Sequence, residues 1–463
     1  MDHAALSQLS KDELIALLLA YAARIAELER RLGLNSSNSG KPPSSDGLKK
    51  PVRVASLREA SGKPTGGQQG HPGKTLRQTA TPDATINHFP ELCTGCGAAL
   101  SKTMATEHTA RQVFDLPEPQ PLVVTEHRAH SCRCAACGTQ TRSRFPEGVA
   151  APVQYGAGIK AFVVYLLHYQ LLPEKRLAVL MADLFNVNIA TATIARISQD
   201  CAERCQVFVD AVRDQVAKAP VKHMDETGFR IGAKTQWLHI ASTIWLTFYR
   251  VSPKRGSLLD NVIGIVVHDH WKPYYTLRGV LHALCNAHHL RELKALVEIE
   301  KEDWARKMQR LLRRACHATK LAREQGVPLN PGLIALIERY YDTILAHGLA
   351  FHETQPALAK IGKRGRPPRR VGHNLLLRLS GRKSDVLRFL TDPSVPFTNN
   401  LAEQDGRMMK VQQKISGGFR SENGAKDFAV IRSVLSTARK QGWNMLQTLI
   451  SDPQRLIAGL RLV

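Results

Sequence analysis

The apolar period of the chain changes at residue 219 from that of helices to that of strands. Three runs rich in β-branched and aromatic residues follow, joined by short polar turns: "VKHMDETGFRI", "WLHIAST" and "IWLTFYRV". A helix-like stretch comes next, and then the apolar strand "GIVV", which ends at His268 and Asp269. A further short strand, "LHALC", follows. This order predicts three antiparallel strands followed by a buried strand that ends on an acidic residue.

Three acidic residues fall on separate elements that such a sheet could bring together. Asp225 is expected in mid-strand, Asp269 at a strand end and Glu403 on a helix. Two-metal phosphoryl chemistry requires hard oxygen ligands from rigid elements that converge. Structural alternatives exist, because Asp225 could face solvent beside Glu226 and Asp269 could be a turn acid. Glu403 would complete a capping box if Asn400 were the N-cap.

The order of the strands matches an RNase H-like sheet, in which acids of this kind hold Mg²⁺. The helix of the third acid carries cations four, seven and eleven residues further on, along one face: Arg407, Lys410 and Lys414. A basic ridge of this kind suits the positioning of a DNA strand, although a solvated face looks the same. His223 shares a strand face with Asp225. Imidazole is a poor Mg²⁺ ligand, so His223 is expected to make a supporting contact, a DNA contact or none.

The bulk properties favour a nucleic-acid partner. The 463 residues exceed a single core, and Lys and Arg outnumber Asp and Glu by 64 to 40, for a net charge of +24. Such a balance suits a polyanion such as DNA or RNA, although charge alone is a weak signal. The apolar run from Leu14 to Ala23 is too short to span a membrane. The cysteine pattern does not suggest a disulfide scaffold, so we expect a reducing compartment inside the cell.

Two Cys-x-x-Cys pairs, in "CTGCG" and "CAACG", predict a structural zinc site. Each pair offers two thiolates to one tetrahedral ion, and the glycine after each second cysteine suits a tight turn. The predicted ligands are Cys93, Cys96, Cys134 and Cys137. Cys132 could replace Cys134, and four unligated thiols are the structural alternative.

Helical and low-complexity segments surround these two regions. Apolar residues three and four apart over residues 11–33 form a short coiled-coil-like seam, equally consistent with a helix docked on its own protein. A Ser-, Gly- and Pro-rich basic stretch follows as a linker that could touch phosphates. Two helices after Pro173, separated by a turn near 186–188, have helix-turn-helix spacing, which plain helical packing also produces. In the basic loop "KRGRPP", Arg364 and Arg366 could enter a minor groove or remain solvated.

Several stretches together resemble transposases of the insertion-sequence family sixty-six. They include "LNSSNSGKPPSSD", "HMDETGFRI", "CNAHHLREL" and "TNNLAEQDGRMMKVQQKISGGFRS". The resemblance implies an RNase H-like catalytic core of the DDE type, with acids at Asp225, Asp269 and Glu403. It also implies the N-terminal helix, the zinc module and a helical insertion between the second and third acids. Related sequences often have Arg-Lys where this chain has Gln413 and Lys414, which leaves the role of Lys414 open.

Cys285 and His288 match a Cys-x-x-His element that follows the second acid in several such transposases. A helix start with a buried thiol gives the same pattern, and the sequence does not justify a metal assignment.

The expected architecture is therefore multidomain α/β. Its segments are a helix at 1–34, a linker at 35–85, a zinc module at 86–148, a helical DNA-binding region at 150–216, core parts at 217–290 and 376–440, an insertion with the basic loop at 291–375 and a tail at 441–463. The resemblance implies a DNA transposase that uses two Mg²⁺ ions to cleave element ends and join the 3′-hydroxyls to target DNA. Its expected partners are double-stranded DNA, accessory proteins and further copies of the chain, with no membrane. The alternatives are a non-catalytic DNA-binding regulator and a nuclease on the same fold.

Overall fold

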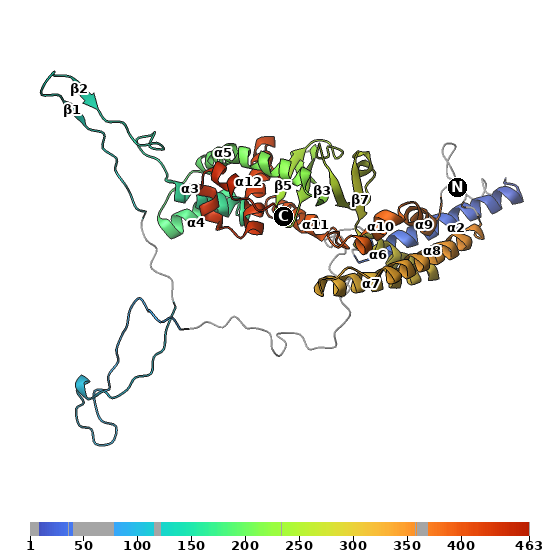
Figure 1. Ribbon diagram of the computed structural model, residues 1–463, viewed down its shortest axis with the longest axis horizontal. Helices are drawn as coiled ribbons and strands as arrows, with labels where there is room; N and C mark the ends of the chain where they lie inside the picture. The colour runs from blue at the N-terminus through green and yellow to red at the C-terminus, as the bar shows by residue number, and fades with distance from the viewer. Residues whose placement is uncertain are drawn as a thin grey trace.

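The computed structural model describes residues 9–35, 37–39, 78–114, 122–232, 234–356, 358 and 369–462. Most of the expected linker and the loop with Arg364 and Arg366 lie outside these ranges. Figure 1 shows a central sheet with helices around it, a group of long helices at one end, and an extended cysteine-bearing segment at the other. Among the described residues, no helix has both the length and the apolar character needed to cross a membrane.

A mixed five-stranded sheet forms the centre of the fold, in the order β5-β4-β3-β6-β7. Its strands are β3 (Val221–Ile231), β4 (Lys234–Ser242), β5 (Thr247–Ser252), β6 (Gly264–His268) and β7 (Val280–Leu284). Strand β4 runs antiparallel to both of its neighbours, β3 and β5, whereas β6 and β7 run parallel to β3. The five strands predicted from the sequence are present and follow one another along the chain as expected.

The prediction of a helix-like stretch before β6 is wrong. Residues 253–263 form turns and bends, which suits a segment that contains Pro253 and Gly256. Arg250 of β5 holds this segment, since its guanidinium donates hydrogen bonds to the carbonyl oxygens of Ser257 and Leu258, at 2.6 Å each.

Side chains of the sheet alternate between two covered faces. On one face, Phe229, Ile240 and Tyr249 pack with α11 (Asn400–Ser416) and the start of α12 (Glu422–Gln441). On the other face, Met224 and Phe248 pack with a helical layer. That layer consists of α3 (Ala157–Val164), the π-helix η3 (Tyr165–Tyr169), α4 (Glu174–Phe185) and α5 (Thr191–Lys218). With both faces covered, Asp225 points toward the α11 layer and Glu226 toward the other.

The helices α4 and α5 lie where the sequence predicts them. Asn186 ends α4 in a left-handed conformation, which Asn tolerates better than most residues. Much of α5 belongs to the core, because Phe208, Val212 and Val216 are fully buried. DNA reading by this pair of helices stays a prediction.

A helical insertion lies between β7 and α11 and packs on the β6–β7 end of the sheet. It contains α6 (Asn286–Ala295), the π-helix η5 (Leu296–Glu300), α7 (Asp303–Glu324), α8 (Pro331–Glu353), α9 (Val371–Gly381) and α10 (Lys383–Thr391). Trp304, Leu312 and Tyr341 are buried between its helices and form one core with Val267 and Leu284 of the sheet. The insertion therefore covers the β6–β7 end of the sheet.

The described residues of the C-terminal tail, 441–462, include two short helices that pack on the core. The helix α12 ends at Gln441, because Gly442 adopts a left-handed conformation and caps it. Two short helices follow, α13 (Met445–Ile450) and α14 (Pro453–Ala458). Leu449 and Leu456 are buried with α5.

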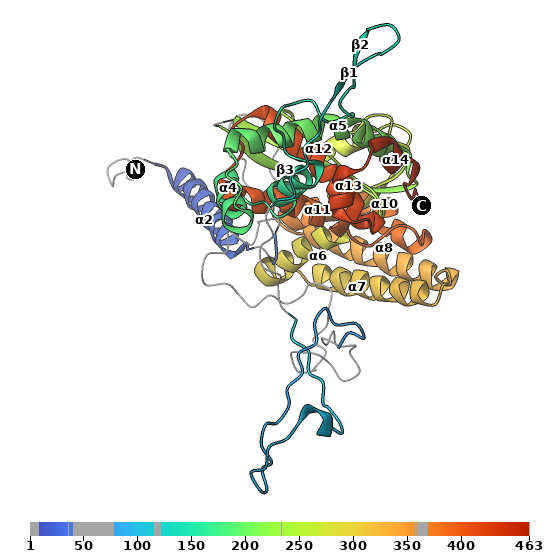
Figure 2. The ribbon, with the colours of Figure 1, turned by 90° about the vertical axis from the view of Figure 1, so that its left-hand side faces the viewer.

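The N-terminal helix α2 (Lys11–Gly33) begins with a complete capping box. The Ser10 hydroxyl accepts from the Glu13 backbone amide at 3.3 Å, and the Glu13 carboxylate accepts from the Ser10 amide at 2.8 Å. The far end of α2 meets the insertion, where the Asn38 side chain donates to Glu298 at 3.2 Å. Most of its apolar seam is exposed, with Leu18 68%, Ile25 56% and Leu32 86% accessible, and Figure 2 shows the helix protruding from the body.

Candidate active site and metal-binding elements

The parallel pairing of β3 with β6 brings the first two acids to the same edge of the sheet. His223 lies opposite Val267 in this pairing. Asp225 follows two residues after His223 within β3, and Asp269 follows two residues after Val267, directly beyond the end of β6. Neighbouring strands are about 4.8 Å apart, so this register makes the two carboxylates neighbours.

Asp225 lies in an environment that disfavours its negative charge. Burial raises the pKa of its carboxyl group well above the usual value, and the nearby charges of Glu226, Asp269 and Glu403 raise it further. One favourable contact opposes this effect, because the Glu226 backbone amide donates to Asp225 Oδ1 at 2.9 Å. All three predicted acids thus belong to one electrostatic neighbourhood. Among the described residues, however, the carboxylate oxygens of these three acids do not all lie within 4.8 Å of one another. A divalent cation would have to draw them closer to bind all three.

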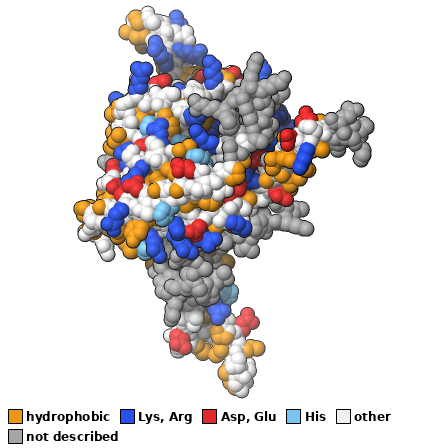
Figure 3. All heavy atoms as spheres, turned by 90° about the vertical axis from the view of Figure 1, so that its right-hand side faces the viewer, with side chains coloured by type: hydrophobic (Ala, Val, Ile, Leu, Met, Phe, Trp, Pro, Cys, Tyr) orange, Lys and Arg blue, Asp and Glu red, His pale blue; other side chains and the backbone are white. Residues whose placement is uncertain are grey.

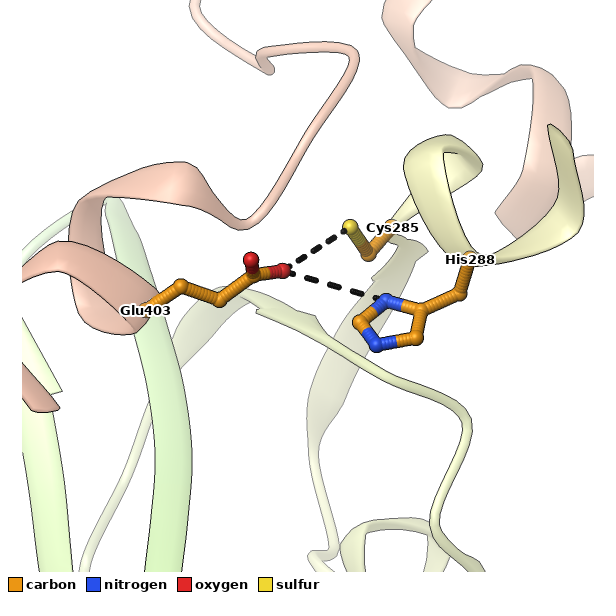
Figure 4. A group of neighbouring side chains, drawn as sticks. All are labelled: Cys285, His288 and Glu403. Carbon is orange, nitrogen blue, oxygen red and sulfur yellow. Dashed lines mark hydrogen bonds and ion pairs between the residues drawn. The ribbon is translucent and has the colours of Figure 1, made fainter. Parts of the chain in front are cut away.

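Glu403 is not the capping-box residue that the sequence allows as an alternative. The N-cap of α11 is Asn399 and not Asn400, and its side chain makes no capping hydrogen bond. Glu403 is therefore the fourth helical residue, one position beyond the place where a capping box needs a carboxylate. Its side chain points instead toward Cys285 and His288 at the start of α6 (Figure 4).

Asn399 joins the elements that carry the acids. It is 1% exposed, and its side-chain amide donates to the Met224 carbonyl oxygen at 2.8 Å. Its Oδ1 lies 3.0 Å from Nδ1 of His223, and its backbone amide donates to Cys285 Sγ at 3.1 Å. The buried His223 therefore supports the start of α11, and burial lowers its pKa to about 4.

A second buried contact fixes α11 two residues after Glu403. The Asp405 carboxylate accepts hydrogen bonds from Ser242 at 2.7 Å and Thr247 at 3.0 Å, and pairs with Lys440 at 2.9 Å. Burial lowers the pKa of Lys440, whereas Asp405 acts in the opposite direction. This contact ties α11 to two strands and to α12, so it helps to set the position of Glu403.

The carboxylate of Glu403 meets three groups of α6 and its N-cap. Its Oε1 lies 3.6 Å from Cys285 Sγ and 3.8 Å from His288 Nδ1, and its Oε2 lies 3.8 Å from Arg291. Burial raises the pKa of Cys285 to about 12, and the charge of Glu403 adds to this effect. Sequence reasoning did not single out Arg291, although it lies in the quoted motif "CNAHHLREL".

A further buried acid, which sequence reasoning missed, lies behind Asp225. The side chain of Glu226 is 1% exposed and pairs with Arg255 at 2.6 Å. It also accepts a hydrogen bond from the hydroxyl of Tyr274 at 2.6 Å. The guanidinium of Arg255 lies 4.2 Å from the ring centre of Trp271. The pattern "DET" shows only that Glu226 is adjacent to Asp225. The partners of Glu226, Arg255 and Tyr274, lie 29 and 48 residues further along the chain.

The predicted cations of α11 are only partly free to meet DNA. Arg407 and Lys414 are exposed, whereas Lys410 donates to the Gly228 carbonyl oxygen of β3 at 2.7 Å. A second basic surface, which the sequence analysis did not flag, follows α7 and consists of the exposed residues Arg306, Arg310, Arg313 and Arg314. Figure 3 views the end of the molecule that carries the insertion and shows Lys and Arg side chains gathered in patches.

The two cysteine pairs form matching turns. The Cys93 amide donates to the Ala98 carbonyl oxygen at 2.8 Å, and the Cys134 amide donates to that of Thr139 at 2.9 Å. In both turns the glycine after the second cysteine has a φ above +70°, which favours glycine. The second turn connects β1 (Ser131–Arg133) to β2 (Gln140–Arg142), and the short 3₁₀ helix η2 (Lys102–Met104) follows the first.

The two turns lie at opposite ends of the cysteine-bearing segment in both ribbon views (Figures 1 and 2). Within the parts of the chain that the structure describes, the four thiols do not form one ligand group. The residues around them are nearly all exposed, so no apolar core brings the turns together. The donor set of each turn fits half of a tetrahedral zinc site.

Comparison with known proteins gives matches along the chain. The model of the Transposase IS66 family matches residues 152–427, and that of the zinc-finger binding domain of transposase IS66 matches residues 90–138. A family of unknown function matches residues 3–77. A protein of Sinorhizobium fredii, described as "Uncharacterized protein y4jO", is 36% identical over 89 residues, which cover 19% of this chain. The matched stretch spans 28% of that relative's length.

Proposed function

Since this chain belongs to the IS66 family of transposases, we propose that it cleaves the ends of an insertion element and joins the 3′-hydroxyls to target DNA. The observation that carries the proposal is the parallel register of β3 and β6, which brings Asp225 and Asp269 to one edge of the sheet, under the helix α11 that carries Glu403. The charges of Asp269 and Glu403 both raise the pKa of Asp225. The sheet order, with three antiparallel strands and two further parallel ones, supports an RNase H-like catalytic core.

The residues of this neighbourhood fit a Mg²⁺ site, because repulsion between their carboxylates is relieved by a divalent cation. Asp225, Asp269 and Glu403 would hold two Mg²⁺ ions. The ions would activate the attacking water or 3′-hydroxyl and stabilise the leaving oxygen in an in-line displacement. The chain's own part is to hold the three acids on rigid elements, through the Asn399 and Asp405 contacts. Exposed Arg407 and Lys414 would position the phosphates.

The decisive experiment is a joining assay with a labelled element-end duplex and a plasmid target, with Mg²⁺ present or replaced by a chelator. We expect Mg²⁺-dependent attachment of the labelled 3′-end to the plasmid. Cleavage without attachment would favour a nuclease on the same fold, and binding without cleavage would favour a DNA-binding regulator. The assay is run with and without proteins encoded in the same element, since we propose that such accessory proteins are partners.

We further propose that the zinc-finger region binds one structural Zn²⁺ through Cys93, Cys96, Cys134 and Cys137. The support is the pair of matching turns, each with two thiols, in a region without an apolar core. The ion would supply the folding free energy that burial does not supply here. Element-end binding by this region, by the helices α4 and α5 and by a minor-groove contact of Arg364 and Arg366 belongs to the same proposal.

A cysteine series tests the zinc proposal. Cys93→Ser and Cys134→Ser are each expected to release one zinc equivalent per chain, because two or three thiolates hold the ion much less well than four. Zinc is counted by elemental analysis of the purified full-length protein. Cys132→Ser is the matched control and should keep the zinc. Loss of zinc in Cys132→Ser with retention in Cys134→Ser would exchange the two assignments.

The exposed seam of α2 supports self-association through a parallel coiled coil between two copies of the chain. Leu18, Ile25 and Leu32 occupy one heptad position, and Tyr21 and Leu28 the other. In a parallel pair, Arg24 of one helix faces Glu29 of the other, which is an attractive pairing between flanking positions. An antiparallel pair would lose this complementarity.

Ile25→Lys is expected to abolish this association, because it places a charge at the centre of the apolar seam. The mass of the full-length protein is measured by light scattering in the absence of DNA. Leu19→Lys is the matched control, since Leu19 is equally exposed but lies outside the seam. An unchanged mass for Ile25→Lys, or equal losses in both variants, would contradict the coiled coil.

A further inference from the structure

We propose that Cys285, His288 and Glu403 form a second zinc site, separate from the cysteine turns. Each residue offers one ligand atom, and these three atoms all lie within 4.8 Å of one another. Figure 4 shows the thiol and the imidazole directed at the same carboxylate oxygen, with the thiol and the imidazole at the start of α6 and the carboxylate on α11. They are the described residues whose potential ligand atoms gather in this way.

The distances between the three side chains fit coordination of one shared metal ion better than direct hydrogen bonds between them. The separations from Glu403 Oε1 are 3.6 Å for Cys285 Sγ and 3.8 Å for His288 Nδ1. A normal hydrogen bond from an imidazole nitrogen is about 2.7–3.2 Å long. In a tetrahedral Zn²⁺ site with bond lengths of about 2.3 Å to sulfur and about 2.1 Å to nitrogen or oxygen, neighbouring ligand atoms are about 3.4–3.6 Å apart. Shifts of a few tenths of an ångström would complete the geometry.

The surrounding structure holds the ligands in this arrangement. Cys285 is the N-cap of α6 and is 1% exposed, and His288 follows three residues later, on the same side of the first turn. The Asn399 amide donates to Cys285 Sγ at 3.1 Å, an outer contact that stabilises a thiolate. Nδ1 of His288 is buried and has no hydrogen-bond partner within the described part of the chain. Coordination would satisfy this atom.

The mixture of ligands selects the kind of metal. A thiolate and an imidazole favour Zn²⁺ over Mg²⁺, which prefers oxygen ligands throughout. Binding would release the thiol proton of Cys285 to solvent and leave a fourth position for water. If Glu403 also belongs to the Mg²⁺ site, a consequence that rests on the proposed function, zinc and Mg²⁺ compete for the same carboxylate. Zinc would then inhibit strand cleavage.

The site itself is tested by counting zinc, which requires no activity. After equilibration with excess Zn²⁺, the full-length protein is expected to bind two zinc ions per chain, one in the cysteine turns and one here. Cys285→Ser and His288→Ala should each lose one of them, whereas the matched control Cys316→Ser should keep both. Because His288 is partly exposed, its substitution should disturb folding less than that of the buried Cys285. Thermal melting verifies that each variant folds. An equal zinc count in the unaltered protein and in both site variants would overturn the proposal.

Competition is tested by zinc titration of the Mg²⁺-dependent cleavage assay. The cleavage rate of each protein is compared with its own rate before zinc is added, so a change in the basal rate of a variant does not affect the comparison. We expect loss of cleavage in the unaltered protein as zinc fills the site, and no such loss in His288→Ala. Equal inhibition of both proteins would reject competition at Glu403, and the zinc count would still decide whether the site exists. A protein that never cleaves DNA would contradict the proposed function alone.

Discussion

Asp225→Asn is expected to lower the rate of Mg²⁺-dependent cleavage by about 10³-fold or more and to leave binding of the element end nearly unchanged. The substitution keeps the shape of the side chain and an oxygen that can accept the hydrogen bond from the Glu226 amide. It removes one of the charges that would hold the metal, and the loss of several kcal/mol of transition-state stabilisation corresponds to about this factor. Cleavage and binding are measured on the same labelled duplex. Asp260→Asn, at an exposed acid of the 253–263 segment, is the matched control.

The same variant should be more stable than the unaltered protein when no divalent metal is present. Burial and the neighbouring acids raise the pKa of Asp225, so the folded state binds this proton more tightly than the unfolded chain does. The carboxyl therefore lowers the free energy of unfolding as the pH rises from the unfolded value of about 4 through the raised folded value. Asparagine does not titrate, so the stability difference between variant and parent should grow over this pH range. Denaturant unfolding at pH 4 and pH 7 measures it.

A stability gain together with a loss of cleavage would separate a catalytic role from misfolding. If Asp225→Asn kept joining DNA ends, the assignment of the active site would be wrong. If it lost both cleavage and stability, Asp225 would be a structural residue of β3.

The sequence predicted the elements of the sheet better than the contacts between them. Alternation and β-branched residues identified the strands, because these signals depend only on local order. The places of Asp225 in mid-strand and Asp269 after a strand followed directly. The segment before β6 was mistaken for a helix, since its apolar residues Leu258, Leu259 and Val262 have helical spacing although Pro253 and Gly256 favour turns.

Contacts between distant residues explain what the sequence could not reveal. Asn399 and Asn400 are both good N-cap residues, and only the buried contacts of Asn399 with His223 and Met224 decide which of them precedes the helix. The Cys-x-x-His element of α6 acquires a third potential ligand from a residue 118 positions away from Cys285. No local pattern records such a distance. The two Cys-x-x-Cys turns could be predicted from the sequence and are present in the structure, whereas their joining at one zinc ion stays a proposal.

Asp405→Asn is expected to cost about 3 kcal/mol of unfolding free energy, because it leaves the ammonium group of Lys440 buried without a charged partner. The side chains of Asp405 and Lys440 are only 16% and 13% exposed, so solvent screens the pair weakly. We expect a value near the lower end of the range for such losses, since Lys440 also donates to the Thr243 and Leu246 carbonyl oxygens. Urea unfolding of the full-length protein provides the measurement. Glu422→Gln, which removes an exposed ion pair with Lys426, should cost less than about 1 kcal/mol.

A double-mutant cycle with Lys440→Met distinguishes a buried pair from two independent contacts. The double variant has no unpaired charge at this place, so its loss of stability should be smaller than the sum of the two single losses by about 1–3 kcal/mol. Additive losses would mean that the ion pair does not hold α11. Because Glu403 lies half a turn from Asp405, Asp405→Asn should also reduce Mg²⁺-dependent cleavage, and the double variant should recover stability more fully than activity. This difference is expected because methionine fills the space of the lysine side chain, whereas the hydrogen bonds that orient the start of α11 need the carboxylate.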